Sequence, residues 1–207
     1  MIPMPMIDYI EASKMAKRYG LRVARAAYVS SADDAVSFAS GKTVVMKVIS
    51  QKAIHKTKSG VVLLDLRGEK EVRKGFSDLT KKAAQLKPYK ILIQEMVKGG
   101  VEIIIGGTVD QQFGKLILLG LGGIYVEVFK DFAERVCPVG RAEAVSMVNQ
   151  LRAKKVIAPD GKSEEMVISL ITRIGKMFED EGLAELDLNP VILHDGTYDL
   201  VDIRAIK

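Results

Sequence analysis

The sequence predicts an α+β protein built from two lobes. Predicted strands are interspersed with helices and many are joined by short turns, which favours α+β lobes over one parallel sheet. Gly99 and Gly100 interrupt the chain near its middle. We therefore expect an N-terminal lobe over residues 1–97, with a leading helix, and a C-terminal lobe over residues 98–207.

In the first lobe the elements follow from residue patterns and breakers. Ser31 is a good helix N-cap, and Asp33 and Asp34 in the first turn suit the helix dipole. The run 43–49 is rich in β-branched residues, which favours a strand. Pro88 cannot continue a helix, so the helix that precedes it is expected to end at residue 86. The expected order is helix 9–19, strand 23–29, helix 31–38, strand 43–49, strand 61–66, helix 69–86 and strand 91–97.

The second lobe is denser in strands. Turns at Gly120–Gly123 and Pro159–Gly161 separate apolar runs, and Asp195-Gly196 is a strong signal for a two-residue hairpin turn. The expected order is strands 101–109, 115–119, 125–129 and 135–139, helices 141–153 and 163–181, and a closing β-hairpin.

Composition narrows the class of protein. The 207 residues are 48% hydrophobic and 28% charged, which allows one core or two small lobes. The net charge of +5 favours anionic ligands, but aromatics make up only 6% and basic residues are scattered among acids, so we expect no nucleic-acid binding. The chain contains no apolar run long enough to span a membrane, and one cysteine, Cys137, fits a reducing compartment as a buried inert thiol. The expected location is the cytoplasm.

The closing hairpin gathers oxygen ligands on one face. Strand alternation points Asp187 and Asn189 to the same side, and the Asp195-Gly196 turn places Asn189 opposite Asp202. Hard divalent cations such as Mg²⁺ prefer carboxylate and amide oxygens. In the same register Arg204 faces Asp187, so a solvated hairpin with a surface ion pair is an equally open interpretation.

The other face of this hairpin is expected to be its apolar back, formed by Leu188, Ile192, Val201 and Ile203. Pro190 has no N–H to donate to a ladder, so the pair is expected to lie at an edge or to carry a bulge.

Lys47 lies inside the apolar run Val44–Ile49, where a buried ammonium needs an anion. It either binds a phosphate or faces water from an edge strand. The following loop holds His55, Lys58, Ser59 and Gly60, the parts of a phosphate cradle, although it does not match a P-loop. Taken alone, His55 fits a surface histidine, as does His194.

Glycines and acids mark the remaining candidates. Gly120-Leu-Gly-Gly123 permits close backbone approach to a ligand, with Gly122 and Gly123 at its end. Glu95 and Glu102 flank the break between the lobes, where they line the mouth of a cleft or are simply solvated acids.

Seven short segments, in order and at compatible spacing, resemble the ATP-grasp β subunit of ADP-forming (NDP-forming) acetyl-CoA synthetase, a relative of the succinyl-CoA synthetase β subunit. The resemblance covers nearly the whole chain. The segments are Val45-Met-Lys-Val, Ile54-His-Lys-Thr-Lys-Ser-Gly, Gln94-Glu-Met-Val, Gln112-Phe-Gly, Gly120-Leu-Gly-Gly-Ile, Val126-Glu-Val and Glu185-Leu-Asp-Leu-Asn-Pro.

This resemblance implies an ATP-grasp fold with ATP or ADP between two α+β lobes, and a reaction that converts acyl-CoA, ADP and phosphate into acid, CoA and ATP. It implies that His55 relays a phosphoryl group from a phosphohistidine on a separate CoA-binding α subunit. The implied nucleotide ligands are Lys47, Lys58, Ser59, Gly60, Gln94, Glu95, Met96, Val97, Glu102, Gly122 and Gly123, and the implied Mg²⁺ ligands are Asp187, Asn189 and Asp202.

Three departures from the family pattern keep two alternatives open. Val61 follows the histidine loop where glycine is usual, Val109 stands where arginine is usual, and residues 153–162 are shortened. The alternatives are a nucleotide-binding or regulatory module with altered chemistry, and a generic ATP-grasp ligase that joins a carboxylate to an amine.

Overall fold

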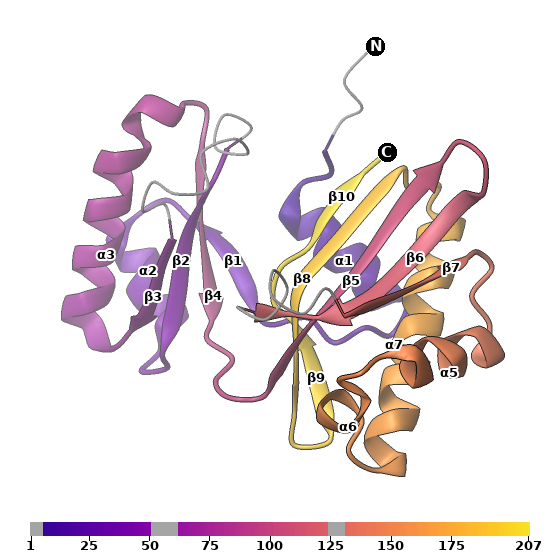
Figure 1. Cartoon of the computed structure of the whole chain (residues 1–207). Coiled ribbons are helices and arrows are strands. Elements are labelled where there is room, and N and C mark those ends of the chain that lie inside the picture. Colours follow the sequence, from indigo (N-terminus) through magenta and orange to yellow (C-terminus); the bar gives the residue numbers. More distant parts are fainter. Residues whose placement is uncertain (1–5, 51–61, 124–130) are drawn as a thin grey trace. The chain divides into compact units, whose positions relative to one another are not determined.

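The computed structural model describes residues 6–50, 62–123 and 131–207, and these fall into two compact units. Ala24–Val97 forms the smaller unit, and Lys98–Lys207 together with the residues up to Val23 forms the larger one (Figure 1).

The smaller unit is a four-stranded antiparallel sheet in the order β1-β4-β2-β3 with helices against one face. The side chains of Val44, Met46 and Val48 pack with α2 and α3 in its core. A capping box at Ser31 and Asp34 begins α2, as the sequence predicts. The elements are β1 (Ala26–Val29), α2 (Ala32–Ala39), β2 (Val44–Ile49), β3 (Val62–Leu66), α3 (Gly68–Ala83), η2 (Ala84–Leu86) and β4 (Lys90–Glu95).

The larger unit contains a six-stranded sheet in the order β10-β8-β5-β6-β7, with β9 paired to β8. All its ladders are antiparallel. The elements are α1 (Tyr9–Arg18), β5 (Val101–Asp110), β6 (Gly114–Leu121), β7 (Phe132–Val136), α5 (Arg141–Gln150), α6 (Lys154–Ile157), α7 (Gly161–Asp180), β8 (Glu185–His194), β9 (Thr197–Leu200) and β10 (Arg204–Ile206).

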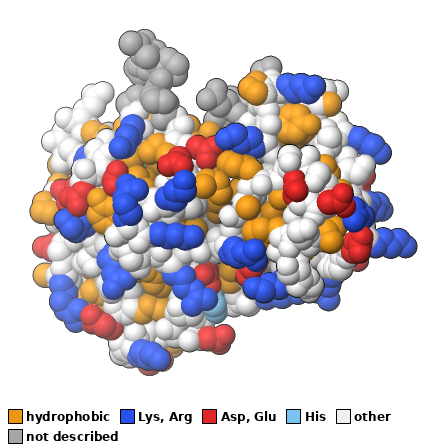
Figure 2. Space-filling view, turned by 180° about the vertical axis from the view of Figure 1, so that it is seen from behind, with side chains coloured by type: hydrophobic (Ala, Val, Ile, Leu, Met, Phe, Trp, Pro, Cys, Tyr) orange, Lys and Arg blue, Asp and Glu red, His pale blue; other side chains and the backbone are white. Residues whose placement is uncertain are grey.

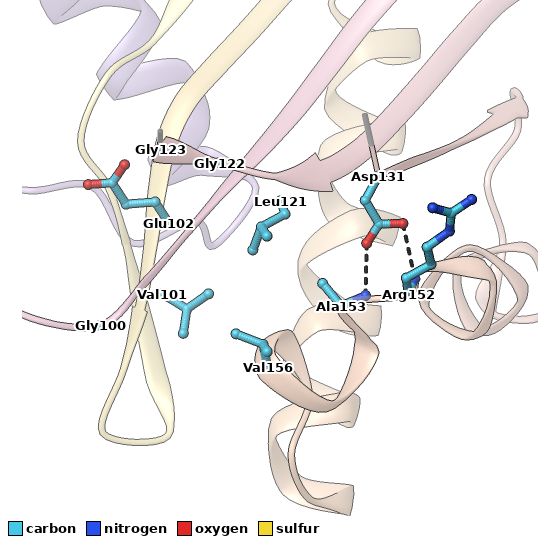
Figure 3. A pocket seen from close by; sticks show the side chains of 10 residues that line it. All are labelled: Gly100, Val101, Glu102, Leu121, Gly122, Gly123, Asp131, Arg152, Ala153 and Val156. Carbon is cyan, nitrogen blue, oxygen red and sulfur yellow. Dashed lines mark hydrogen bonds between the residues drawn. The ribbon is translucent and has the colours of Figure 1, made fainter. Parts of the chain in front are cut away.

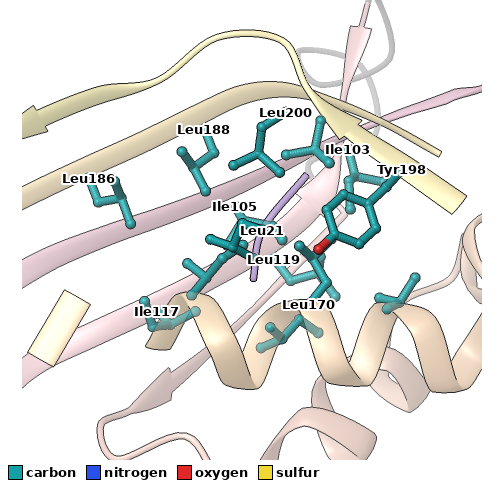
Figure 4. Packing of buried hydrophobic residues seen from close by; sticks show 14 of the residues in the cluster. Leu21, Ile103, Ile105, Ile117, Leu119, Leu170, Leu186, Leu188, Tyr198 and Leu200 are labelled. Atoms are coloured by element: carbon teal, nitrogen blue, oxygen red, sulfur yellow. The ribbon is translucent and has the colours of Figure 1, made fainter. Parts of the chain in front are cut away.

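One face of this sheet carries the core of the larger unit. Inward residues of β5, β6 and β8, such as Ile105, Ile117 and Leu188, are fully buried against α7 residues including Leu170 (Figure 4). The opposite face of the sheet presents the intervening residues, because side chains alternate along a strand. The core therefore leaves Asp187 and its neighbours on the other face.

The leading helix α1 belongs to the larger unit, although the sequence analysis placed it in the first lobe. Ala12, Met15 and Ala16 are buried in the larger core, and the Tyr9 hydroxyl donates to the Val201 carbonyl at 3.2 Å. An amphipathic pattern shows that a helix has an apolar face but not which core that face joins.

Strand β8 carries a bulge at Asn189-Pro190. Ile103 pairs with Val191 and Ile105 pairs with Leu188, so two residues of β8 lie opposite Ile104. The bulge therefore occurs at Pro190, but in the β5–β8 ladder and not in the hairpin pair where it was expected. The bulge reverses the alternation beyond it, so Val191 and Leu193 lie in the core.

The bulge also corrects the predicted apolar back of the hairpin. Leu188 and Ile203 lie in the core as expected, whereas Ile192 lies outside the core cluster, paired with Glu102 and Asp199. Val201 is only partly buried. Strict alternation across Pro190 was therefore wrong for Ile192.

Several strand ends differ from the predicted ranges; β1, for example, begins at Ala26 and not at Val23. β4 stops at Glu95, so Met96 and Val97 lie beyond it, with the Met96 amide donating to the Thr43 carbonyl. β7 spans Phe132–Val136 instead of 135–139, because Pro138 has no N–H to continue the ladder with β6.

The surface shows the mixture of basic and acidic residues that the sequence predicts. On the face drawn in Figure 2, Lys and Arg side chains are interspersed with Asp and Glu. Within the described ranges, none of the helices has the length and apolar character to cross a membrane.

Candidate functional site

The hairpin register predicted from Asp195-Gly196 is confirmed. His194 pairs with Thr197 beside the turn, and Asp187 pairs with Arg204 at the far end. The pairs on either side of residues 201–203 keep the same offset, so no residue slips between them and Asn189 lies opposite Asp202. Asp187, Asn189 and Asp202 consequently share the face of the sheet that points away from the core.

The pKa of the Asp187 carboxyl group depends on its burial and on the charged groups around it. Burial raises the pKa of its carboxyl group, the Asp202 charge raises it further, and the Arg204 guanidinium opposes both. Burial and the Asp202 charge outweigh the Arg204 guanidinium, so the ionised form of Asp187 is disfavoured on balance. A divalent cation would favour the ionised form.

The donor set fits Mg²⁺ completed by a substrate. Mg²⁺ is usually held by one or two carboxylates together with substrate phosphates and waters. Among the described residues, no group of three or more His, Cys, Asp or Glu side chains is placed to hold a metal ion. Two carboxylates and an amide match the incomplete seat that a nucleotide-bound Mg²⁺ needs.

A pocket of about 710 Å³ lies in the same unit, where β5 and β6 meet the loop before α6 (Figure 3). Val101, Leu121 and Val156 form apolar walls, while Glu102 and Asp131 lie at opposite sides. The other lining residues are Gly100, Gly122, Gly123, Arg152 and Ala153. Apolar walls with a few polar groups are typical of small-molecule sites.

The glycines of this pocket are required by close packing. A Cβ on Gly122 would lie 2.9 Å from the Glu102 carbonyl, and the Gly122 amide donates to that carbonyl at 2.7 Å. Gly123 has φ of +69° and lies against the Glu102 carboxylate. The structure thus brings together three predicted nucleotide ligands, namely Glu102, Gly122 and Gly123.

Asp131 fixes the opposite side of the pocket. Its carboxylate accepts from the Arg152 amide at 3.0 Å and the Ala153 amide at 2.8 Å, just before α6. Asp131 was not among the predicted site residues, because a single acid between two predicted strands gives no sequence signal.

In the smaller unit, Lys47 lies on β2, which is paired on both sides, so the edge-strand interpretation of Lys47 was wrong. Its side chain is partly buried and points away from Val44, Met46 and Val48, which pack against the helices. Lys47 thus lies on the sheet face opposite to the helices, where an ammonium group can reach an anionic ligand.

Gln94 and Glu95 end β4 on the same sheet. Gln94 is almost fully buried at 1% exposure and pairs with Val45, two residues before Lys47. Glu95 accepts from Arg25 at 2.9 Å and Lys42 at 2.8 Å, and these bonds lower the pKa of its carboxyl group. Glu95 is therefore an anchored carboxylate, not a solvated acid.

His194 is more than a surface histidine, contrary to the prediction. Its Nε2 lies 2.8 Å from Asp199, a 6%-exposed residue whose other oxygen accepts from Arg22 at 2.8 Å. The three side chains form a network that fastens the β8–β9 hairpin to the segment after α1. The pairing of positions 22 and 199 is not readable from sequence.

Four predicted residues, His55, Lys58, Ser59 and Gly60, lie outside the described residues, as does Glu127. Cys137 is partly buried, and burial raises the pKa of its thiol to about 11. The thiol therefore stays protonated and unreactive near neutral pH.

These features define a nucleotide-binding class of fold: the model of an ATP-grasp domain matches residues 5–206, and the chain belongs to the ATP-grasp family. Among its relatives is the β subunit of acetate–CoA ligase [ADP-forming] II from Pyrococcus furiosus, which is 33% identical over 97% of this chain and 91% of the relative.

Solved structures of an acetyl-coenzyme A synthetase are also similar to this chain in sequence and fold. Acetyl-coenzyme A synthetase 1 from Ca. Korarchaeum cryptofilum, in complex with coenzyme A and Ca-AMPCP, is 34% identical with a TM-score of 0.87, covering 97% of this chain and 93% of that one. Another structure of the same enzyme holds coenzyme A and Mg-AMPPCP, with its phosphohistidine segment pointing towards the nucleotide-binding site; it has a TM-score of 0.81, 34% identity, and covers 97% and 92%.

Proposed function

We propose that this chain is the nucleotide-binding β subunit of an ADP-forming acyl-CoA synthetase and works with a CoA-binding α subunit. The observation that carries the proposal is the strand register that opposes Asp187 to Arg204 and brings the Asp202 charge to bear on Asp187. Support comes from two Pyrococcus furiosus relatives that are named as β subunits of acetate–CoA ligases [ADP-forming], and from the Korarchaeum complex with Mg-AMPPCP.

Each proposed nucleotide ligand has a role that follows from the chemistry of its side chain or backbone. Lys47 is a point charge for nucleotide phosphates. Glu102, Gly122 and Gly123 line the pocket in the larger unit. The end of β4 and the residues after it supply further nucleotide ligands in the proposal, namely Gln94, Glu95, Met96 and Val97. Lys58, Ser59 and Gly60 complete the phosphate-binding loop in the proposal.

Asp187, Asn189 and Asp202 would hold Mg²⁺, which would neutralise phosphate charge during phosphoryl transfer. The acceptor in the proposal is the His55 imidazole. Its nitrogen forms a P–N bond while the P–N bond to the partner's phosphohistidine breaks, and that imidazole leaves with the electron pair. A β-phosphate oxygen of ADP then attacks the phosphorus, the bond to His55 breaks, and ATP forms.

The test mixes the chain with its α subunit, an acyl-CoA, ADP, phosphate and Mg²⁺, and measures ATP. We expect ATP formation with the wild type and none with His55→Ala, because no other group replaces the relay. His194→Gln is the matched control, since the chain has two histidines and His194 binds Asp199 within its own hairpin. Full turnover by His55→Ala would remove the relay role.

The wild type and the His55→Ala variant also distinguish this proposal from the alternative of a nucleotide-binding or regulatory module with altered chemistry. That alternative rests on departures such as Val109, which is 50% exposed near the end of β5. It predicts Mg·ATP binding without a phosphohistidine on His55, whereas the enzyme proposal predicts a His55 phosphoramidate detectable by mass spectrometry at neutral pH. Coupling of a carboxylate to an amine without any effect of CoA would favour the generic ligase.

A further inference from the structure

Arg204 lies directly across from Asp187 in the pairing of β10 with β8. Side chains of directly opposed residues lie on the same face of a sheet, within about 5.5 Å at Cβ. Arg204 therefore projects onto the face that carries Asn189 and Asp202, in the described part of the larger unit.

The Nε atom of Arg204 is buried, and within the described part of the chain it has no hydrogen-bond partner. Its Nη2 atom approaches Glu185 only to 4.0 Å, which is too long for a hydrogen bond, while the side chain as a whole is 40% exposed. An unsatisfied buried donor on a charged group is costly, so a native protein normally provides an acceptor.

Other arginines of this chain behave differently. Arg18, Arg22 and Arg25 each donate to a carboxylate at 2.7–2.9 Å. Arg204 has Asp187 opposite and Glu185 beside it, yet it closes on neither. Its donors are thus left to a ligand that reaches the outer face.

The ligand chemistry follows from the surrounding charge. Three carboxylates, Glu185, Asp187 and Asp202, act on this patch, and Arg204 is the cation that opposes them at Asp187. A free anion would be repelled by the carboxylates, whereas an anion that arrives with a divalent cation would satisfy the carboxylates and the guanidinium together. Phosphate oxygens match the planar fork of arginine.

We propose that Arg204 is a nucleotide-binding residue whose guanidinium donates to a phosphate oxygen of the Mg²⁺-bound nucleoside diphosphate or triphosphate at Asp187, Asn189 and Asp202. This inference rests on the proposed function. It differs from a role in positioning Asp187, because a positioning residue would affect metal binding without nucleotide.

The test compares the wild type, Arg204→Met, Arg204→Lys and the control Arg141→Met, an exposed arginine on α5 paired with Glu165. Calorimetry measures Mg·ADP affinity, and electron paramagnetic resonance measures Mn²⁺ binding without nucleotide. We expect Arg204→Met to weaken Mg·ADP binding by about ten- to a hundredfold, the loss of a charge-assisted hydrogen bond. Arg204→Lys should lie between, because it keeps the charge and loses the fork.

Mn²⁺ binding without nucleotide should stay equal or become tighter in Arg204→Met, since a cation beside the carboxylates is removed. Unchanged Mg·ADP affinity in both Arg204 variants overturns the inference, as does an equal loss of Mn²⁺ and Mg·ADP binding. Weaker binding of inorganic phosphate with unchanged Mg·ADP binding also overturns it. If Arg204→Met does not fold, Arg204→Lys decides. A wild type that does not bind Mg·ADP refutes the proposed function instead.

Discussion

Asp187 shows how a single residue can be arranged for a ligand at the expense of the ligand-free protein. Its carboxylate is partly buried beside Asp202, and both conditions disfavour ionisation, which raises the pKa. Nothing in folding alone requires two acids on neighbouring strands. Two neighbouring acids are what the proposed Mg²⁺ seat requires.

Replacing Asp187 by Asn should separate these two effects. The raised pKa means that the unfolded chain releases this proton at lower pH than the folded chain, so the wild type loses stability as pH rises from the ordinary aspartate pKa through the raised one. Asp187→Asn lacks this loss. We expect a ligand-free melting temperature at neutral pH at least equal to that of the wild type, and Mg·ADP affinity weaker by at least about tenfold.

Glu11→Gln is the control for Asp187→Asn, because Glu11 is an exposed acid paired with Lys14 on α1. It should change neither measurement. Lower ligand-free stability of Asp187→Asn across this pH range would show that the carboxylate stabilises the fold, contrary to the metal-seat interpretation.

Gly122 allows a second prediction at the residue scale. A methyl group there would meet the Glu102 backbone at 2.9 Å, and backbone cannot move aside as a side-chain tip can. Gly122→Ala should lower the free energy of unfolding by about 1–3 kcal/mol and weaken nucleotide binding through displacement of Glu102. Gly161→Ala is the matched control, since nothing lies within 4 Å of its added Cβ. Equal stability of the two variants in denaturant titrations would contradict the packing argument.

Among the elements, α1 supplies a hydrogen bond beside the β8 bulge in addition to its packing in the larger core. The Val201 amide donates to the Pro190 carbonyl at 3.1 Å, but Pro190 has no N–H to return the bond. The Tyr9 hydroxyl supplies the missing donor to the Val201 carbonyl. A helix side chain thus completes the ladder beside the metal seat.

Tyr9→Phe should therefore destabilise the larger unit by about 1 kcal/mol, and speed amide hydrogen exchange in residues 200–203. Tyr19→Phe serves as the control, because Tyr19 lies at the other end of α1 and its hydroxyl interacts with Asp180 and, at 3.4 Å, with Glu181. If exchange in residues 200–203 is the same in both variants, the hydroxyl does not support the ladder.

The hairpin also shows what sequence can and cannot determine. The register of Asp187 with Arg204 was predictable, because a two-residue turn at Asp195-Gly196 fixes every later pair. The placement of Ile192 was not, since the bulge at Pro190 reverses the strand faces. Contacts between residues distant in sequence, such as Arg22 with Asp199, depend on tertiary packing and leave no local pattern.

At the scale of the whole molecule, the proposed nucleotide ligands come from both compact units. Lys47, Gln94 and Glu95 belong to the smaller unit, and Glu102, Gly122 and the metal seat belong to the larger one. The two cores are separate hydrophobic clusters. Each unit can therefore report ligand binding by itself.

Mg·ADP should stabilise the larger unit, which carries the pocket and the proposed Mg²⁺ ligands. At a concentration about 100 times its dissociation constant, a ligand that binds only the folded protein adds about 2.7 kcal/mol, which corresponds to a melting temperature higher by about 5–10 °C. Hydrogen exchange should slow in β2 around Lys47 and in β8 and β10 together. Asp187→Asn should keep at most about half of this thermal shift at the same Mg·ADP concentration, given its weaker affinity. Protection confined to β8 and β10 would show that Lys47 does not contact the nucleotide, and the proposed site would then be restricted to the larger unit.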